Sequence, residues 1–91
     1  MGSRMSSKRR ISENNLSKVP NQSGVYILHR GSKSRYVGSA GAGRLQKRIR
    51  QQLNDKRGVT SFQFRPTTSE REARKLEKQY CNRVNQKQKR I

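Results

Sequence analysis

Short apolar runs bounded by turn-forming residues mark the first structured part of the chain. Residues 25–28 read Val-Tyr-Ile-Leu, which is β-branched and aromatic, and they directly follow Gly24. Residues 35–37 read Arg-Tyr-Val and come after the turn-forming residues 31–34, Gly-Ser-Lys-Ser. These runs predict a β-hairpin whose short strands are joined by a turn of about four residues. Because apolar side chains alternate onto both faces of the first strand, we expect a sheet that is covered on both sides.

The apolar spacing then changes to that of a helix. Leu45, Ile49 and Leu53 recur at every fourth position and form a narrow apolar stripe. This stripe predicts a helix over residues 44–54. The glycine-rich residues 38–43 in front of it are expected to form a flexible loop. They lack the Lys-Ser/Thr ending that a phosphate-binding P-loop requires.

The remaining residues predict one more strand and one more helix. Residues 59–65 alternate between apolar and polar types, with Phe62 and Phe64 on one face, and a proline ends this strand. Residues 69–72 read Ser-Glu-Arg-Glu, which is the pattern of a capping box at the start of a helix. We expect this helix to extend to about Asn85.

A carboxylate interrupts the apolar face of the second helix. The expected buried face consists of Ala73, Leu76, Tyr80 and Val84. Glu77 falls inside the same arc of the helix. A carboxylate on a core-facing stripe is costly unless it is paired or binds a cation. Arg74, one turn back, is a candidate ion-pair partner, so the sequence leaves both explanations open.

The elements follow the order strand, strand, helix, strand, helix. This order predicts a single small α+β domain over residues 16–85, with a three-stranded antiparallel sheet flanked by helices. Residues 1–15 and 86–91 are polar and basic, and we expect them to be disordered tails. Residues 1–5 read Met-Gly-Ser-Arg-Met, which resembles a vector-derived segment ahead of a native start.

Basic residues greatly outnumber acidic ones. The chain has 23 Lys and Arg against 5 Asp and Glu, which gives a net charge of +18. This excess predicts a polyanionic partner, with nucleic acid ahead of an anionic membrane surface. No apolar run approaches the ~18 residues of a membrane span, and no signal peptide is apparent. Cys81 and His29 are single residues of their kinds, so neither a disulfide nor a zinc site is expected, and the chain fits an intracellular location, in the cytoplasm, nucleoid or nucleus.

Two tyrosines on the predicted hairpin are candidate functional residues. Each lies in a glycine-framed triplet, Gly-Val-Tyr at 24–26 and Tyr-Val-Gly at 36–38. Arg48 follows on the first helix and Glu77 on the second. In this order the residues resemble the catalytic domain of the GIY-YIG nuclease family, whose name-giving triplets read Gly-Val-Tyr and Tyr-Val-Gly here, both common substitutions. The resemblance covers residues 16–85.

The resemblance implies a divalent-metal-dependent DNA endonuclease that hydrolyses phosphodiester bonds. By position, Glu77 would ligate Mg²⁺ or Mn²⁺, and Arg48 would steady the scissile phosphate. Tyr26 would orient or deprotonate the attacking water, and Tyr36 would support the site. DNA is the implied partner, and neither a small-molecule cofactor nor a membrane is expected. A separate DNA-reading domain or partner protein would supply the choice of target.

General chemistry agrees with these roles. Hydrolysis of a phosphodiester builds negative charge on oxygens, which a metal and a guanidinium neutralise with fixed geometry. Tyrosine is a poor base because its ordinary pKa is about 10. Tyr26 would therefore act as a base only if Arg48 and the metal lowered its pKa, and otherwise it would position the water.

The first helix and its ends carry the residues that are expected to bind DNA. These residues are Arg44, Lys47, Arg48, Arg50, Lys56 and Arg57. Arg48 and Gln52 lie on a flank of the apolar stripe, whereas Lys47 and Arg50 are expected to point to solvent. The glycine-rich loop is longer than in many members of the family, so Arg44 stays an alternative to Arg48 at the scissile phosphate.

Three further residues are candidates for the site. Gln52 stands where many family members have a histidine or tyrosine, and glutamine cannot shuttle a proton. Asn85 lies closer to Glu77 than the asparagine of many members, and His29 lies near the hairpin turn. The sequence therefore leaves open a catalytically weak or inactive nucleic-acid-binding module of the same fold, and also a basic RNA-associated protein.

Overall fold

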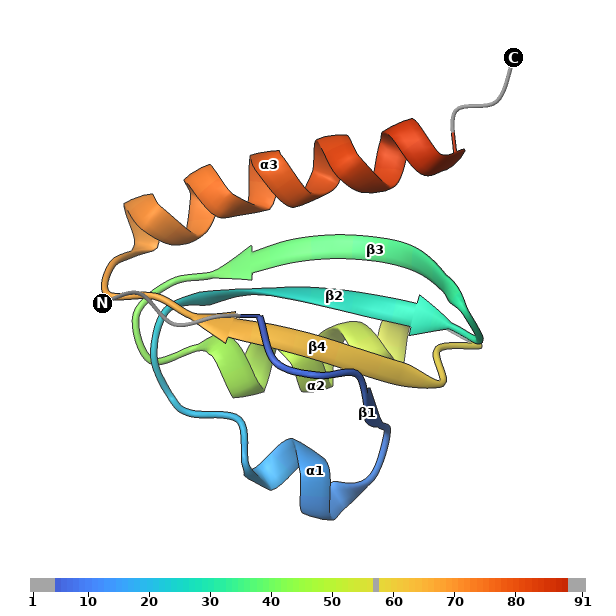
Figure 1. Ribbon diagram of the computed structural model, residues 1–91. Coiled ribbons are helices and arrows are strands. Elements are labelled where there is room, and N and C mark those ends of the chain that lie inside the picture. Colours follow the sequence, from blue (N-terminus) through green and yellow to red (C-terminus); the bar gives the residue numbers. More distant parts are fainter. Residues whose placement is uncertain (1–4, 57, 89–91) are drawn as a thin grey trace.

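The computed structural model describes residues 5–56 and 58–88, with the backbone alone for residues 83–88. Figure 1 shows how its helices and strands are arranged. They are β1 (Arg9–Arg10), α1 (Glu13–Ser17), β2 (Gly24–Arg30), β3 (Lys33–Ala40), α2 (Leu45–Asp55), β4 (Ser61–Pro66) and α3 (Glu70–Gln88). Within the described ranges, no helix is both long and apolar enough to cross a membrane.

An antiparallel sheet forms the centre of the fold, and its strand order is β1-β4-β2-β3. The expected α+β class, with helices beside an antiparallel sheet, is confirmed, but the expectation of three strands is wrong because the sheet has four. The extra strand is β1, in which Arg9 pairs with Phe62 and Arg10 with Ser61. Two arginines carry no apolar alternation, and strand pairing depends on backbone groups, so the sequence pattern did not indicate this strand.

The N-terminal residues pack into the fold. The Ser6 N–H donates to the Phe64 carbonyl oxygen at 2.8 Å, and the Phe64 N–H donates to Ser6 Oγ at 3.0 Å. α1 then follows Ser12, whose Oγ accepts a hydrogen bond from the Asn15 N–H at 3.1 Å. These contacts show that residues 6–15 belong to the fold, whereas composition alone suggested a disordered tail over residues 1–15.

The last helix ends later than the sequence predicts. α3 continues to Gln88, which corrects the expected end of the folded domain at residue 85. Residues 1–4, which form most of the vector-like segment, and residues 89–91 lie outside the described residues.

The hairpin is longer than its apolar residues predict. β2 extends to Arg30 and β3 begins at Lys33, so the turn consists of Gly31 and Ser32. Gly31 has a φ of 62°, a left-handed conformation that glycine adopts readily. β3 also includes Gly38, which the sequence places in a flexible loop, because strand pairing needs backbone groups and not side chains.

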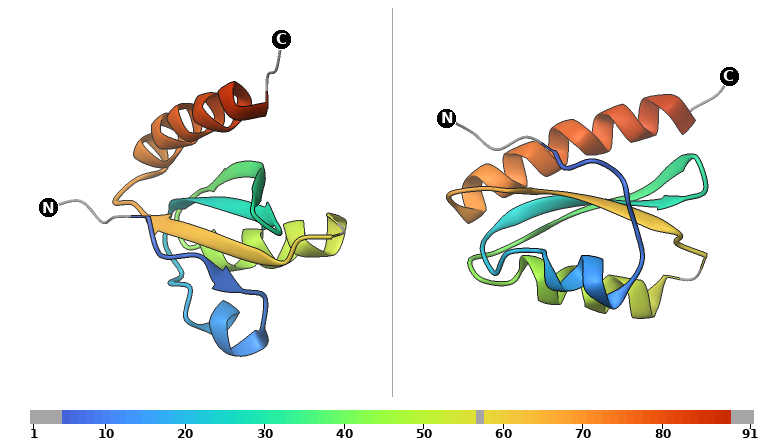
Figure 2. Two further views of the ribbon diagram at one scale, coloured as in Figure 1. Left: turned by 45° about the vertical axis from the view of Figure 1, so that its right-hand side comes forward. Right: turned by 60° about the horizontal axis from the view of Figure 1, so that its bottom comes forward.

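Helices cover both faces of the sheet, as expected. α2 lies below the sheet and α3 above it in Figure 1, and both views of Figure 2 keep these two helices on opposite sides. α1 lies on the same side as α2. Any site shared by α2 and α3 must therefore lie around an edge of the sheet.

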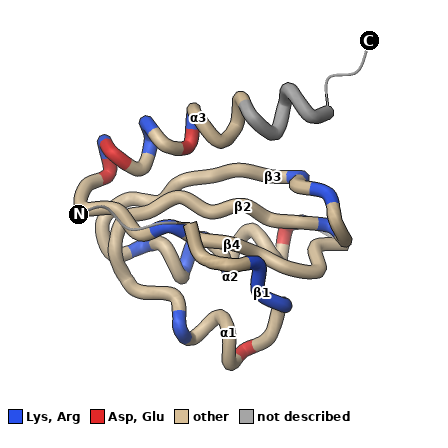
Figure 3. Tube along the Cα trace, in the orientation of Figure 1, with Lys and Arg blue, Asp and Glu red and all other residues tan. Residues whose placement is uncertain are grey.

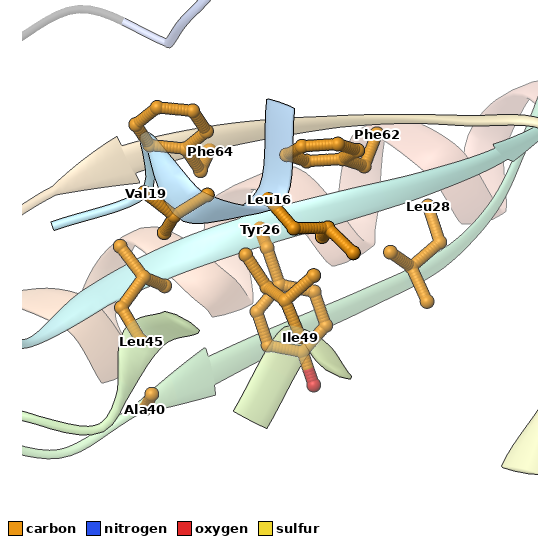
Figure 4. Close-up of a cluster of buried hydrophobic side chains, with 9 residues drawn as sticks. All are labelled: Leu16, Val19, Tyr26, Leu28, Ala40, Leu45, Ile49, Phe62 and Phe64. Carbon is orange, nitrogen blue, oxygen red and sulfur yellow. The ribbon is translucent and has the colours of Figure 1, made fainter. Parts of the chain in front are cut away.

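The main core lies between the sheet and the α1 and α2 helices. Its buried residues, drawn in Figure 4, are Leu16, Val19, Tyr26, Leu28, Ala40, Leu45, Ile49, Phe62 and Phe64. Leu45 and Ile49 are fully buried, which confirms the apolar stripe predicted for this helix. Side chains alternate along a strand, so buried Val25 and Ile27 of β2 face the other side, where Ala73 of α3 is also buried.

The start of α3 is held by a cap and by a buried hydrogen bond. The Glu72 N–H donates to Ser69 Oγ at 3.2 Å, as the capping box predicts. The Glu72 carboxylate accepts from the Thr68 N–H at 3.0 Å, one residue earlier than the usual reciprocal bond. The buried Ser23 hydroxyl donates to the Thr67 carbonyl oxygen at 3.0 Å, which ties the entry to α3 to the start of β2.

Candidate active site at the edge of the sheet

Tyr26 and Gly38 are cross-strand partners in the β2–β3 pair. A Cβ atom at Gly38 would overlap the hydroxyl and ring carbons of Tyr26. The ring therefore lies across β3 at the residue of that strand that has no side chain. Tyr26 is buried, and Figure 4 shows its hydroxyl at the end of the ring that points away from β2. Because β3 is the last strand in the sheet order, this hydroxyl reaches toward the free edge.

A pocket of about 400 Å³ opens at this edge. Its walls come from β2, β3 and the following loop, α2 and α3. The lining residues are Tyr26, residues 37–41, Arg48, Gln52, Glu70, Arg74 and Glu77. α2 and α3 lie on opposite faces of the sheet, so the pocket wraps around β3. It brings together Tyr26, Arg48 and Glu77, which are all catalytic candidates from the sequence.

Glu77 enters the pocket from the α3 side. Its Oε1 accepts a hydrogen bond of 2.6 Å from the Ser39 hydroxyl. Ser39 directly follows Gly38, so alternation places its side chain on the α3 face of β3. The alternative partner, Arg74, instead forms an ion pair with Glu70, with Nη2 and Oε2 2.6 Å apart. Within the described residues, Glu77 forms no ion pair.

The surroundings of Glu77 fit a divalent cation of the kind that keeps part of its water shell. Mg²⁺ is usually bound by one or two carboxylates, with waters and substrate phosphate oxygens as its other ligands. Glu77 offers one half-buried carboxylate in an open polar pocket, and Ser39 holds its orientation. Among the described side chains there is no group of three or more His, Cys, Asp and Glu that could hold a metal ion. A metal at Glu77 would therefore take most of its ligands from water and substrate.

Arg48 forms part of the α2 wall of the pocket. Its side chain is exposed, and its Nη1 donates to Gln51 Oε1 at 3.3 Å. Its charge lies close enough to Tyr26 to act on the pKa of the phenol. Arg44, at the N-cap position of α2, is exposed and does not line the pocket. The geometry therefore favours Arg48 over Arg44 as the arginine of the site.

The environment of Tyr26 keeps its phenol protonated. Burial raises the pKa of Tyr26 above its ordinary value of 10.0, and this effect outweighs the lowering by the Arg48 guanidinium. The Glu77 carboxylate raises the pKa further. A neutral phenol near pH 7 can orient a water through a hydrogen bond, whereas it is a poor proton acceptor. Of the two roles expected for Tyr26, the environment therefore favours orienting the attacking water over deprotonating it.

Tyr36 lies outside the pocket. It pairs across the strands with Leu28 and is 36% exposed, and Lys56 Nζ lies 5.0 Å from the centre of its ring. Tyr36 precedes Gly38 by two positions, so it shares the Tyr26 face of the sheet but sits about 7 Å further along the strand. The structure therefore separates Tyr36 from the three catalytic candidates that line the pocket.

The further candidates divide between the pocket and the rest of the fold. Gln52 lines the pocket, as its position on the helix flank suggests. His29 is buried elsewhere, where its Nε2 is hydrogen-bonded to Gln63 Oε1 at 2.7 Å and its Nδ1 to the Ser34 hydroxyl at 3.2 Å. These contacts favour a structural role for His29. Asn85 belongs to α3, but its side chain lies outside the described part of the chain.

The expected DNA-binding residues are in different environments. Lys47 is exposed on α2, as predicted. Arg50 does not point freely to solvent, because it is half-buried and its Nη1 and Nη2 lie 2.7 Å and 2.8 Å from the two carboxylate oxygens of Glu13. Lys56 lies over the Tyr36 ring, and Arg57 lies outside the described residues. Figure 3 shows further basic residues on β1 and at the turn end of β2 and β3.

The sequence did not identify three polar residues of the pocket, Ser39, Glu70 and Arg74, as candidates for the site, and it indicated Arg74 only as a candidate ion-pair partner of Glu77. Glu70, Arg74 and Glu77 are spaced i, i+4, i+7, so they lie on one face of α3. That spacing was a usable signal, although the capping pattern explained Glu70 without it. Ser39 gave no such signal, because the sequence places it in a loop, where the alternation of a strand does not apply.

Comparisons with known proteins give this chain no relative. No family model, no curated protein and no solved structure matches it.

Proposed function

We propose that this chain is a divalent-metal-dependent DNA endonuclease of the GIY-YIG type that hydrolyses phosphodiester bonds. The observation that carries the proposal is the pocket at Gly38, whose lining includes Tyr26, Arg48 and Glu77 from three different elements. Residues that lie far apart in the sequence are thus neighbours in a polar pocket of a strongly basic protein. The excess of Lys and Arg supports DNA as the substrate, because a polyanion is the natural partner of a chain with a charge of +18.

Arg48, Tyr26 and Ser39 have distinct tasks in this proposal. The Arg48 guanidinium binds the non-bridging oxygens of the scissile phosphate and neutralises the charge that builds there during attack. The neutral phenol of Tyr26 orients the attacking water through a hydrogen bond. Ser39 donates a hydrogen bond to Glu77 Oε1 and so holds the carboxylate in its place in the pocket.

Glu77 is the residue that would hold the metal. A bound Mg²⁺ or Mn²⁺ would supply Lewis-acid stabilisation of the phosphate and leaving-group oxygens. Gln52 cannot transfer a proton to the leaving group, so solvent would have to do so. We also propose that a separate DNA-reading domain or partner protein supplies target choice, since the pocket residues act on the phosphate backbone.

A plasmid assay tests the proposal. Supercoiled plasmid is incubated with the protein in Mg²⁺, in Mn²⁺ and in EDTA, and nicked circles are measured on a gel. We expect nicking with either metal and none in EDTA. Glu77→Gln keeps the size of the side chain but removes the anionic ligand, so it should fold and bind DNA but fail to nick.

Glu72→Gln is the matched control for this variant. It makes the same change of charge on the same helix, and Glu72 does not line the pocket. Glutamine also retains the capping hydrogen bond. Nicking by folded Glu77→Gln protein at the parent rate would refute the metal-ligand role.

A non-catalytic nucleic-acid-binding module is the second candidate function. Gln52 in the pocket and the neutral Tyr26 phenol favour it, because neither group transfers a proton readily. The same assay separates the two functions. Plasmid binding in a gel shift, together with an absence of nicking in Mg²⁺ and Mn²⁺, would establish the binding module instead.

A further inference from the structure

The pocket contains a second arginine, which has no task in the reaction proposed above. Arg74 lines the same pocket as Arg48 but comes from α3, on the opposite face of the sheet. Its Nη2 lies 2.6 Å from Glu70 Oε2. Glu70 in turn rests against the loop after β3, since a Cβ atom at Gly41 would come within 2.9 Å of its Oε1. Glu70 therefore holds Arg74 at the α3 wall of the pocket.

The Arg74 guanidinium keeps capacity for a second anion. The ion pair uses Nη2, whereas a guanidinium carries five N–H donors in a planar fork. The side chains of Arg74 and Glu70 are 71% and 50% exposed, so an incoming anion can reach the fork without displacing part of the fold. A planar fork of donors suits phosphate oxygens well, and an arginine that is already held loses less side-chain freedom on binding.

Arg74 and Arg48 differ in their relation to the reacting centre. The charges that act on the Tyr26 phenol are those of Arg48 and Glu77, and Arg74 is not among them. Arg74 nevertheless precedes Glu77 by three residues, which is about 4.5 Å along the helix axis. A DNA strand at the free edge would present consecutive phosphates to the two walls of the pocket. Arg74 lines the pocket from the α3 side, whereas Arg48 lines it from the α2 side.

We propose that Arg74, held by Glu70, is a second phosphate-binding position of this pocket. It binds the phosphate that neighbours the scissile one in the DNA strand. This inference rests on the proposed function, which identifies the anion as DNA. Arg74 is then a positioning residue: it fixes the strand across the edge of β3 so that Arg48 and Tyr26 meet the scissile phosphate.

A binding measurement in EDTA tests the position without any hydrolysis. The dissociation constant of a short fluorescein-labelled DNA duplex is measured by anisotropy for Arg74→Gln and Arg71→Gln. Arg71 is exposed on the same helix and does not line the pocket, so it controls for the loss of one positive charge. We expect Arg74→Gln to weaken binding about fivefold more than Arg71→Gln. Equal weakening by the two variants, both folded by circular dichroism, overturns the proposal.

A double-mutant cycle tests whether Glu70 acts through Arg74. The change in DNA affinity caused by Glu70→Gln is measured in the parent and in the Arg74→Gln background, beside the same cycle for Glu72→Gln. We expect the effect of Glu70→Gln to depend on Arg74, and the effect of Glu72→Gln to be the same in both backgrounds. If Glu70→Gln changes the DNA affinity equally in the parent and in the Arg74→Gln background, the two residues form an ordinary surface ion pair. That result would contradict the proposed role of Glu70.

Kinetics distinguishes failure of this inference from failure of the proposed function. Arg74→Gln should raise the DNA concentration for half-maximal nicking more than it lowers the saturated rate, whereas Arg48→Ala should do the reverse. If the parent does not nick DNA but the affinity difference between Arg74→Gln and Arg71→Gln remains, the phosphate position stands and the catalytic proposal fails. If the parent nicks and that difference is absent, the phosphate position fails alone.

Discussion

The side chain of Tyr26 occupies the space that any side chain at position 38 would need. Gly38 is therefore required by the ring that crosses it and not by its backbone torsion, because the glycines with positive φ are Gly31, Gly43 and Gly58. The Tyr-Val-Gly triplet thus has a physical meaning in this fold. Because Gly38 has no side chain, the Tyr26 ring of the neighbouring strand can cross the edge strand there and reach the pocket.

Replacing Gly38 by alanine should destabilise the protein and displace the Tyr26 ring. Overpacking of this kind typically costs about 1–3 kcal/mol, which urea unfolding can measure. The hydroxyl of Tyr26 is the nearest obstacle, so Gly38→Ala should cost less in a Tyr26→Phe background. Strictly additive effects of the two substitutions would contradict the overlap that the structure shows.

Arg48→Ala should lower the rate of nicking at saturating DNA by about a hundredfold, the usual effect of removing a group that stabilises transition-state charge. Arg44→Ala should mainly raise the DNA concentration needed for half-maximal nicking, since Arg44 lies outside the pocket. Steady-state kinetics on plasmid DNA measures both effects. A larger loss of rate for Arg44→Ala would show that the loop before α2 brings a different arginine to the phosphate.

The ion pair between Arg50 and Glu13 should make the stability of the fold depend on pH. The hydrogen-bonded Arg50 guanidinium lowers the pKa of the Glu13 carboxyl below its ordinary value of 4.5. A carboxyl whose pKa is lower in the folded state stabilises the fold above its unfolded pKa, and this stabilisation disappears as the pH falls through the folded value. Glu13→Gln should therefore be less stable than the parent near neutral pH, with a difference that shrinks below pH 4.5. Urea unfolding over a pH series checks this, and a difference that stays constant with pH would contradict it.

Binding to DNA should weaken steeply as salt is added. If the exposed basic residues neutralise about four phosphates, the logarithm of the binding constant should fall with the logarithm of salt concentration with a slope near −3.6. Fluorescence anisotropy in EDTA, repeated over a range of potassium chloride concentrations, measures the slope. A slope near zero would remove the argument that the charge of the chain serves DNA binding.

The sequence predicted those parts of the fold whose signal lies in side-chain periodicity. The stripe of Leu45 and Ile49 located α2, and the same reasoning identified Glu77 as a carboxylate on the inner face of α3. β1 was not predicted, because Arg9 and Arg10 join the sheet through backbone hydrogen bonds. The periodicity of side chains gives no information on such bonds.

The sequence named Tyr26, Arg48 and Glu77 as candidates, and these three residues line one pocket, whereas the other features of the pocket depend on the three-dimensional arrangement. Tyr26 and Tyr36 look equivalent as members of matching triplets, yet only Tyr26 has a glycine partner that lets its ring reach the edge. Ser39 reads as an ordinary loop residue until β3 is known to extend past Gly38. The pairing of Arg74 with Glu70, and not with Glu77, depends on rotamers that spacing along a helix does not determine.

The position of the pocket at the margin of the sheet has a consequence for the shape of the substrates it can take. A chain that enters a closed cavity or a tunnel must be threaded from one of its ends. β3 is flanked by sheet on one side only, so a polymer can approach its free edge sideways, at any point along its length. A nuclease built on this edge would need no strand terminus, and covalently closed circles would be as accessible to it as linear fragments.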